Sequence, residues 1–260
     1  MTLRFDIQYQ TLSLPPPYSY GYTLHAELAD ASVAVALDWQ YTDRDELSEE
    51  EIGEEGFTPD DDFQWQGTLP AVWKPVLETL WKQTTWLPVT GAQSEDRSLV
   101  ITITEPTGQV TTGVPSDIGQ WDYLLQELVQ AVYEAAQRER PLQIRYLEVH
   151  RTGSSEEVAF NISFLHRRCT MTVQSATPIR TQKLPWYEAS ALLETLYLPD
   201  YTIDHSSATY PRRQGRYIDP GDERWYPVGT AVLNPGKKDV LQQLHQRIQK
   251  MASSHRKDQR

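Results

Sequence analysis

The stretch around residue 60 carries side chains that could recognise a basic partner. Three aspartates, Asp60, Asp61 and Asp62, follow a run of glutamates and precede Phe63 and Trp65. Carboxylates attract a basic protein over a long range and speed the encounter, and neighbouring aromatic rings can anchor the complex. This composition predicts a partner-binding surface made of Asp60, Asp61, Asp62, Phe63 and Trp65.

A second candidate stretch is basic and lies near the C-terminus. Arg212, Arg213 and Arg216 are close in sequence to Trp225. Guanidinium groups bind phosphates and carboxylates through paired hydrogen bonds, and they stack on aromatic rings. These four residues therefore predict an anion or nucleotide site. The alternative is a surface strand pair whose arginines offset part of the acidic charge elsewhere.

The familiar catalytic signatures are absent. The chain has no GxSxG, HExxH or GxxxxGK[ST] motif, its one cysteine excludes a CxxC site, and its six histidines lack metal-ligand spacing. Asp204 and His205 could pair as orienting acid and base, but a turn explains them more simply. The three aspartates at residues 60–62 could hold Ca²⁺, although a solvated charge run is the simpler explanation. We therefore expect no catalytic residues, no metal and no cofactor.

The net charge of −12 is concentrated in one segment. Residues 42–62, the acidic insertion, hold eleven acids against Arg44 alone, a balance of −10 that leaves −2 for the remaining chain. Nucleic-acid binding requires a strongly positive face, so this distribution argues against a nucleic-acid partner. The insertion has little apolar content, and we expect it to form a mobile or solvated loop.

The remaining composition indicates a folded protein outside membranes. Hydrophobic residues make up 39% of the chain, and eight tryptophans support a packed core. No apolar run could span a bilayer, and the N-terminus begins with strand-like alternation instead of a signal peptide. A single cysteine fits a reducing compartment, so we expect a cytoplasmic protein.

Apolar spacing predicts that the chain contains an internal duplication. The amphipathic helix around Leu125, which places Asp122 on its polar face, matches a helix around Leu241 at a shift of 116 residues (241 − 125). In the preceding hairpins, Val33 matches Cys169 at a shift of 136 (169 − 33). The difference of 20 residues places one extra segment in the first half, at the acidic insertion. Self-similarity over a long period is typical of repeated structural units.

Each half is expected to run β-β-β-α-β-β-α, with halves at 1–139 and 140–260. Alternating residues predict a third strand ending at Trp39, and Thr68-Leu69-Pro70 is expected to start the next helix. Hairpins without β-α-β crossovers imply antiparallel sheets with helices packed on one face, an α+β fold. The short join at Arg140-Pro141 predicts that the two halves pack closely together.

A proline run interrupts the first hairpin. Leu14 is followed by three prolines and then by Tyr18, Tyr20 and Tyr22. An extended polyproline segment beside aromatic rings is typical of a recognition segment. The alternative is a connecting loop whose tyrosines cover the sheet.

Together these features predict a non-enzymatic interaction module, an adaptor or an inhibitor, that binds a basic protein through its acidic, aromatic-flanked loop. The alternative is an anionic small-molecule or nucleotide-binding protein, or a hydrolase, that uses the arginines of the second half. By analogy with fused homodimers, a duplicated chain is expected to be a monomer.

Overall fold

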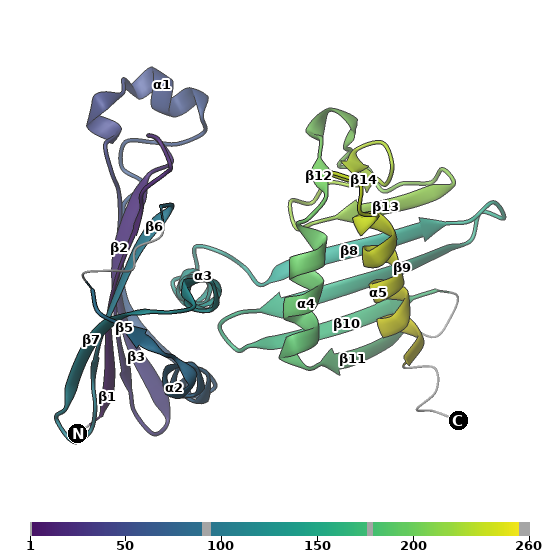
Figure 1. Cartoon of the computed structure of the whole chain (residues 1–260). Coiled ribbons are helices and arrows are strands. Elements are labelled where there is room, and N and C mark those ends of the chain that lie inside the picture. The colour runs from purple at the N-terminus through teal and green to yellow at the C-terminus, as the bar shows by residue number, and fades with distance from the viewer. Residues whose placement is uncertain (1, 90–94, 176–178, 255–260) are drawn as a thin grey trace. The chain divides into compact units, whose positions relative to one another are not determined.

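The computed structural model describes residues 2–89, 95–175 and 179–254. The chain divides into two compact units, Met1–Glu139 and Arg140–Arg260. Each unit contains an antiparallel sheet with helices on it (Figure 1), which confirms the α+β class. None of the helices in the described part of the chain has the length and apolar character needed to cross a bilayer.

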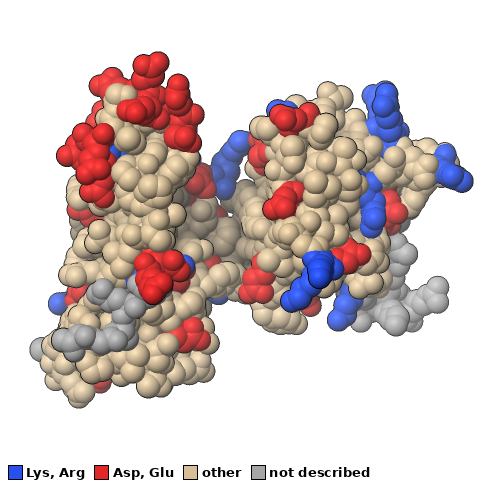
Figure 2. All heavy atoms as spheres, turned by 45° about the horizontal axis from the view of Figure 1, so that its top comes forward, with Lys and Arg blue, Asp and Glu red and all other residues tan. Residues whose placement is uncertain are grey.

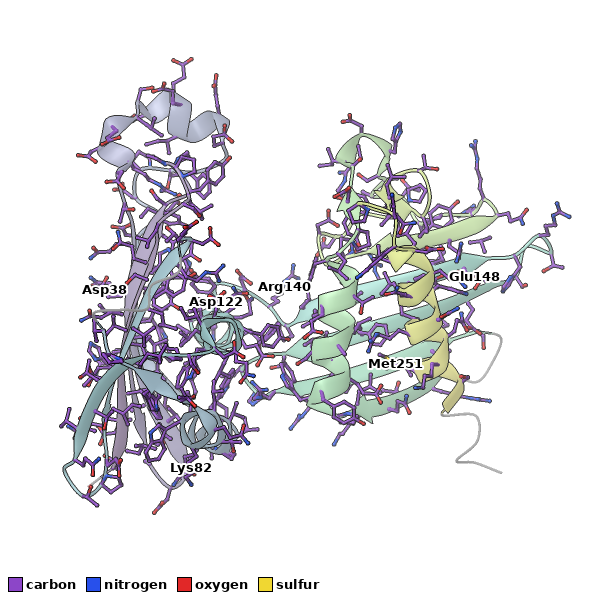
Figure 3. The ribbon with its side chains drawn as sticks, in the orientation of Figure 1. Asp38, Lys82, Asp122, Arg140, Glu148 and Met251 are labelled. Carbon is purple, nitrogen blue, oxygen red and sulfur yellow. The ribbon has the colours of Figure 1, made fainter. Side chains whose placement is uncertain are left out.

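The first unit is built on a seven-stranded sheet in the order β4-β3-β2-β1-β6-β7-β5. Its strands are β1 (Leu3–Thr11), β2 (Tyr20–Leu28), β3 (Ser32–Tyr41), β4 (Phe63–Pro70), β5 (Trp86–Leu87), β6 (Arg97–Thr104) and β7 (Val110–Pro115). Helices α2 (Trp73–Gln83) and α3 (Ile118–Ala135) lie on the same side of this sheet (Figure 1). Alternate residues of the central strand, such as Phe5 and Ile7, are buried on that side and form the core. Asp38 of β3 lies on the opposite face (Figure 3).

The helix α3 begins where its capping residue predicts. The Asp117 side chain accepts a hydrogen bond from the Gln120 backbone N–H at 3.2 Å. The predicted apolar stripe is buried at Trp121, Leu124, Leu125, Leu128 and Val132. The placement of Asp122 on an exposed face was wrong: this residue is 7% exposed and pairs with Arg97 of β6. A charged partner on the sheet makes this burial tolerable.

The second unit repeats the arrangement on a six-stranded sheet, β11-β10-β9-β8-β13-β14. Its strands are β8 (Leu142–Val149), β9 (Ser155–Ser163), β10 (Arg168–Gln174), β11 (Arg180–Leu184), β13 (Gly215–Asp219) and β14 (Tyr226–Pro227), with a separate small pair of β12 (Asp200–Tyr201) and β15 (Val232–Leu233). Helices α4 (Trp186–Leu196) and α5 (Val240–Ser254) cover one side of the six-stranded sheet (Figure 1). In the β9–β10 hairpin, Phe160 pairs with Met171 and Ile162 with Cys169.

Each unit has one more strand before its first long helix than the sequence predicted. The strands β4 and β11 extend the expected three-stranded meanders to four. The expected helix start at Thr68 was therefore wrong, because Thr68 to Pro70 belong to β4 and α2 begins at Trp73. Proline at residue 70 resembles a helix N-terminus, but it is equally compatible with an edge strand such as β4.

The two units share one strand order, since β4-β3-β2-β1-β6-β7 corresponds position by position to β11-β10-β9-β8-β13-β14. Residues matched by sequence shift lie on corresponding elements: Val33 is in β3 and Cys169 in β10, while Leu125 is in α3 and Leu241 in α5. The duplication of an ancestral unit and the close packing of the halves stay predictions.

Candidate functional site

The acidic insertion contains regular structure. It forms a 3₁₀ turn at Arg44–Glu46 and the helix α1 (Glu49–Glu54). The Ser48 side chain accepts a hydrogen bond from the Glu51 N–H at 3.3 Å, and the Glu51 carboxylate accepts one from the Ser48 N–H at 2.8 Å. This reciprocal cap satisfies the first turn of α1. The expected mobile or solvated loop is solvated, but it is not only a loop, because the capping box at Ser48 starts a helix in a segment with little apolar content.

The only cation of the insertion, Arg44, lies inside it. Its side chain is 8% exposed. The guanidinium donates from Nε to the Pro17 carbonyl at 3.1 Å, and from Nη1 to the Thr58 carbonyl at 2.6 Å and to Asp61 Oδ2 at 3.0 Å. One side chain therefore joins three segments: the loop before β2, the turn at Arg44, and the end of the insertion.

Two aromatic rings enclose the same guanidinium. The Arg44 Cζ atom lies 3.6 Å from the centre of the Tyr41 ring and 4.7 Å from that of Phe57. Cation–π attraction offsets part of the cost of removing a guanidinium from water. The Nη2 nitrogen is buried without a hydrogen-bond acceptor among the described residues. The attraction of the two rings is therefore important for keeping this guanidinium buried.

The partner of Arg44, Asp61, is held in its ionised form. Burial opposes ionisation, but hydrogen bonds from Thr58 and Arg44 outweigh it and hold the pKa of the Asp61 carboxyl below its usual value. Thr58 donates both its backbone N–H, at 2.8 Å, and its hydroxyl, at 2.6 Å. The charges of Arg44 and Asp61 thus cancel within the insertion.

The remaining ten carboxylates of the insertion are exposed: Asp43, Asp45, Glu46, Glu49, Glu50, Glu51, Glu54, Glu55, Asp60 and Asp62. Among the residues that the structure describes, no lysine or arginine lies within ion-pair distance of them. Figure 2 shows acidic side chains gathered over this part of the first unit. The insertion therefore presents a surface of one charge sign on an ordered support.

The five predicted partner-binding residues differ in exposure and in their contacts. Asp60 is exposed, whereas Asp61 is engaged by Arg44 and Thr58. Asp62 is exposed but also accepts a hydrogen bond from the Tyr41 backbone N–H at 2.8 Å, across the start of β4. Two of the three aspartates thus reach the surface, and the third stabilises the insertion internally.

The two predicted aromatic anchors are half-buried parts of β4. The Phe63 ring lies 5.2 Å from the Tyr133 ring of α3, and the Arg138 guanidinium lies 4.5 Å over it. The Trp65 ring covers Gly67, where an added Cβ would lie 2.4 Å from the ring. Both rings pack against other parts of the first unit and keep part of their surface exposed.

Aromatic rings of β1, β2 and β3 form a stack, in which Tyr20 and Tyr22 cover the sheet as the alternative interpretation of the proline segment expected, while the part of Tyr9 and Trp39 was not predicted. The Tyr20 and Trp39 rings lie 4.2 Å apart, Tyr22 and Trp39 5.2 Å, and Tyr9 and Tyr22 4.8 Å, all nearly parallel. The register pairs Tyr22 with Trp39 and Tyr9 with Tyr22, so the stack follows cross-strand neighbours. The signal was the alternation of aromatic residues toward the ends of three strands.

In the second unit, Trp225 is a core residue. It is 2% exposed and packs with Leu147 and Val149. Tyr146 bonds His245 of α5, so the next residue, Leu147, faces the other side of the sheet. A second small core therefore covers that side. The Arg145 guanidinium lies 4.6 Å over the Trp225 ring, which leaves no open ring face for an anionic ligand to share with arginine.

The three predicted anion-binding arginines do not converge on Trp225. Arg212 and Arg213 are exposed, and the Arg213 carbonyl accepts the Tyr217 hydroxyl at 3.0 Å. Arg216 instead pairs with Glu148 across β8 and lies near Tyr146 and His245, on the helix-covered side of the sheet, where its charge lowers the pKa of His245. The structure therefore brings these residues into different environments, with Trp225 beneath Arg145 on the opposite side.

Tyr146 and His245 form a side-chain pair of a kind that can act in proton transfer. The Tyr146 hydroxyl and His245 Nδ1 are 2.6 Å apart. Burial and the nearby Arg216 charge lower the pKa of His245, against an opposing effect of Glu148. Burial raises the pKa of the Tyr146 hydroxyl, so this tyrosine is not activated as a base or nucleophile.

A shallow groove of about 500 Å³ lies between α4 and α5. Its lining includes Glu188, Arg247, Lys250 and Met251, the last of which is labelled in Figure 3. The lining carries charges of both signs. Over residues 2–89, 95–175 and 179–254, no three His, Cys, Asp or Glu side chains are grouped to hold a metal ion; His255 lies outside the described residues.

The two units carry net charges of opposite sign. The first unit contains 6 Lys and Arg against 24 acids, a balance of −18, and the second contains 18 against 12, a balance of +6. The nearly neutral remainder of the chain is thus a sum of opposite charges.

Comparison with protein-family models, with curated proteins and with solved structures returned no match to this chain.

Proposed function

We propose that the protein is a non-enzymatic interaction module whose acidic insertion binds a basic surface of another protein. One observation carries the proposal: the insertion neutralises its only cation internally and keeps ten carboxylates exposed on a capped, anchored scaffold. A purely solubilising segment would not require a buried arginine with three hydrogen bonds and two aromatic contacts.

Anchoring matters for affinity because an ordered surface loses less conformational entropy on binding than a flexible one. Uniform charge raises the association rate through long-range attraction, which salt screens over about 8 Å at physiological ionic strength. Both effects favour a partner whose positively charged patch is similar in size to the acidic surface of the insertion. The free, buried thiol of Cys169 is consistent with the reducing cytoplasm as the place of action.

The test is a comparison of three versions of the full chain on an affinity matrix. The variant Glu49→Gln/Glu50→Gln/Glu54→Gln removes three exposed charges from α1, and the control Glu194→Gln/Asp200→Asn/Asp204→Asn removes three exposed charges from the second unit. Lysate from the source cells is applied, and the retained proteins are identified by mass spectrometry.

We expect the wild type and the control to retain the same basic protein, and the α1 variant to lose it. Raising the salt concentration should release that protein from the wild type. Retention that is equal for all three versions, or indifferent to salt, would contradict the proposal.

A further inference from the structure

The loop between β1 and β2, residues 12–19, exposes large apolar side chains beside the acidic insertion. We call it the proline loop. Leu12 is 47% exposed, Leu14 44% and Tyr18 41%. Single exposed apolar side chains are ordinary on protein surfaces, but three in one short loop form a local concentration. Tyr20 and Tyr22, by contrast, pack on the sheet, so the exposure is confined to the loop.

The proline loop and the insertion are fixed to each other. The Thr42 N–H donates to the Ser19 carbonyl at 2.9 Å, and the Ser19 hydroxyl donates to the Thr42 carbonyl at 2.7 Å. Arg44 binds the Pro17 carbonyl at 3.1 Å. The Tyr18 ring packs edge-on against Phe57 at 5.4 Å, and its hydroxyl donates to Glu55. These contacts hold the second half of the proline loop, Pro17 to Ser19, against the insertion, and Leu12 and Leu14 precede it in the same short loop.

We infer that the proline loop and the acidic insertion form a single docking surface for a basic protein segment that carries apolar side chains next to its lysines or arginines. This inference rests on the proposed function and adds the apolar half of the partner. Ten exposed carboxylates repel nucleic acid, an anionic bilayer and the first unit of a second copy. A partner without positive charge would gain no electrostatic attraction to these carboxylates when it binds Leu12 and Leu14.

The two halves of the surface have different physical roles. Carboxylates accelerate association, and their effect falls with added salt. Buried apolar side chains slow dissociation, and their effect is nearly independent of salt. Burial of one leucine against an apolar partner group changes affinity by roughly tenfold.

The experiment uses the full chain and two synthetic peptides of equal length and equal positive charge. One peptide carries leucines between its lysines, and the other has serine at those positions. Binding is measured by fluorescence anisotropy at low and physiological salt. The test variant is Leu12→Ser/Leu14→Ser, and the matched control is Val110→Ser, which alters a 60% exposed residue of the same unit away from the insertion.

We expect the wild type to bind the leucine peptide at least tenfold more tightly than the serine peptide. The Leu12→Ser/Leu14→Ser variant should bind both peptides as the wild type binds the serine peptide, and Val110→Ser should change neither affinity. The variant Glu49→Gln/Glu50→Gln/Glu54→Gln should weaken both peptides together, most strongly at low salt.

Other outcomes distinguish the apolar contribution of the proline loop from electrostatic binding by the insertion. Equal affinity of the wild type for the two peptides, or a preference that survives in Leu12→Ser/Leu14→Ser, overturns the apolar half and leaves electrostatic binding intact. Failure to bind either peptide at low salt overturns both. Binding of phosphatidylserine vesicles that depends on Leu12 and Leu14 would identify a membrane as the occupant and also overturn the inference.

Discussion

Replacement of Arg44 by alanine should release the acidic insertion while leaving the sheet folded. The change removes the only side chain that connects the Pro17 carbonyl, the Thr58 carbonyl and Asp61. Breaking a buried charge pair costs about 3–5 kcal/mol. Asp61 is 28% exposed, and water can partly replace its partner, so we expect the lower end of that range, about 3 kcal/mol. A change of that size corresponds to roughly a hundredfold rise in local opening.

Hydrogen exchange measured by mass spectrometry reads this opening directly. The informative amides are Ile52, which bonds the Ser48 carbonyl, and Phe57, which bonds the Ile52 carbonyl. Their exchange should become roughly a hundredfold faster in Arg44→Ala, while the paired amides of β1 and β2 stay protected. Arg44→Lys should give an intermediate result, because it keeps the charge but loses the planar fork.

Arg138→Ala is the matched control, since it removes another arginine stacked on an aromatic ring of the same unit, at an exposed site. Unchanged exchange at Ile52 and Phe57 in Arg44→Ala would refute the anchoring role. Loss of protection throughout the first unit would refute it in another way, because Arg44 would then support the sheet itself.

Three further predictions concern stability. Trp225→Ala should lower the free energy of unfolding of the second unit by about 3–5 kcal/mol, because it removes a buried ring. The control Arg213→Ala should leave the thermal midpoint unchanged. Calorimetry that finds equal effects of the two changes would contradict the second core. Gly53→Ala should stabilise α1 by up to about 1 kcal/mol, because an added Cβ at that position meets open space. Gly67→Ala should destabilise the first unit by about 1–3 kcal/mol, because the Trp65 ring must shift to make room for the Cβ. Because the folded state lowers the pKa of His245, its contribution to stability is fully present above the unfolded pKa of 6.5 and is lost as pH falls below it; denaturant titrations should show this slope in the wild type and not in His245→Gln.

The fold class and most of the strands could be predicted because each buried face has a simple repeat. Val158, Phe160 and Ile162 alternate, as do Cys169, Met171 and Val173, and their pairing follows from the short turn between them. The fourth strand of the first unit was missed although Phe63, Trp65 and Leu69 alternate in the same way. Its two aromatic residues, beside an acidic run, equally suit partner binding, and its terminal proline equally suits a helix start.

The role of Arg44 could not be predicted from the acidic run. Two of its partners are backbone carbonyls, at Pro17 and Thr58, which leave no mark in side-chain patterns. The burial of Trp225 did have a signal. Tyr146 and Leu147 are apolar neighbours in one strand, which indicates a strand covered on both faces. A covered second face requires an apolar residue from a distant segment, and Trp225 supplies it.

The position of β1 in the middle of its sheet has a consequence for synthesis on the ribosome. The strand is made before both of its neighbours, β2 along one edge and β6 along the other. That edge stays unpaired until Arg97–Thr104 has been made. In the second unit, β8 likewise waits for β13, Gly215–Asp219. Each sheet therefore has an open central edge until its later strand has been made, and an open strand edge is a template for pairing with other chains.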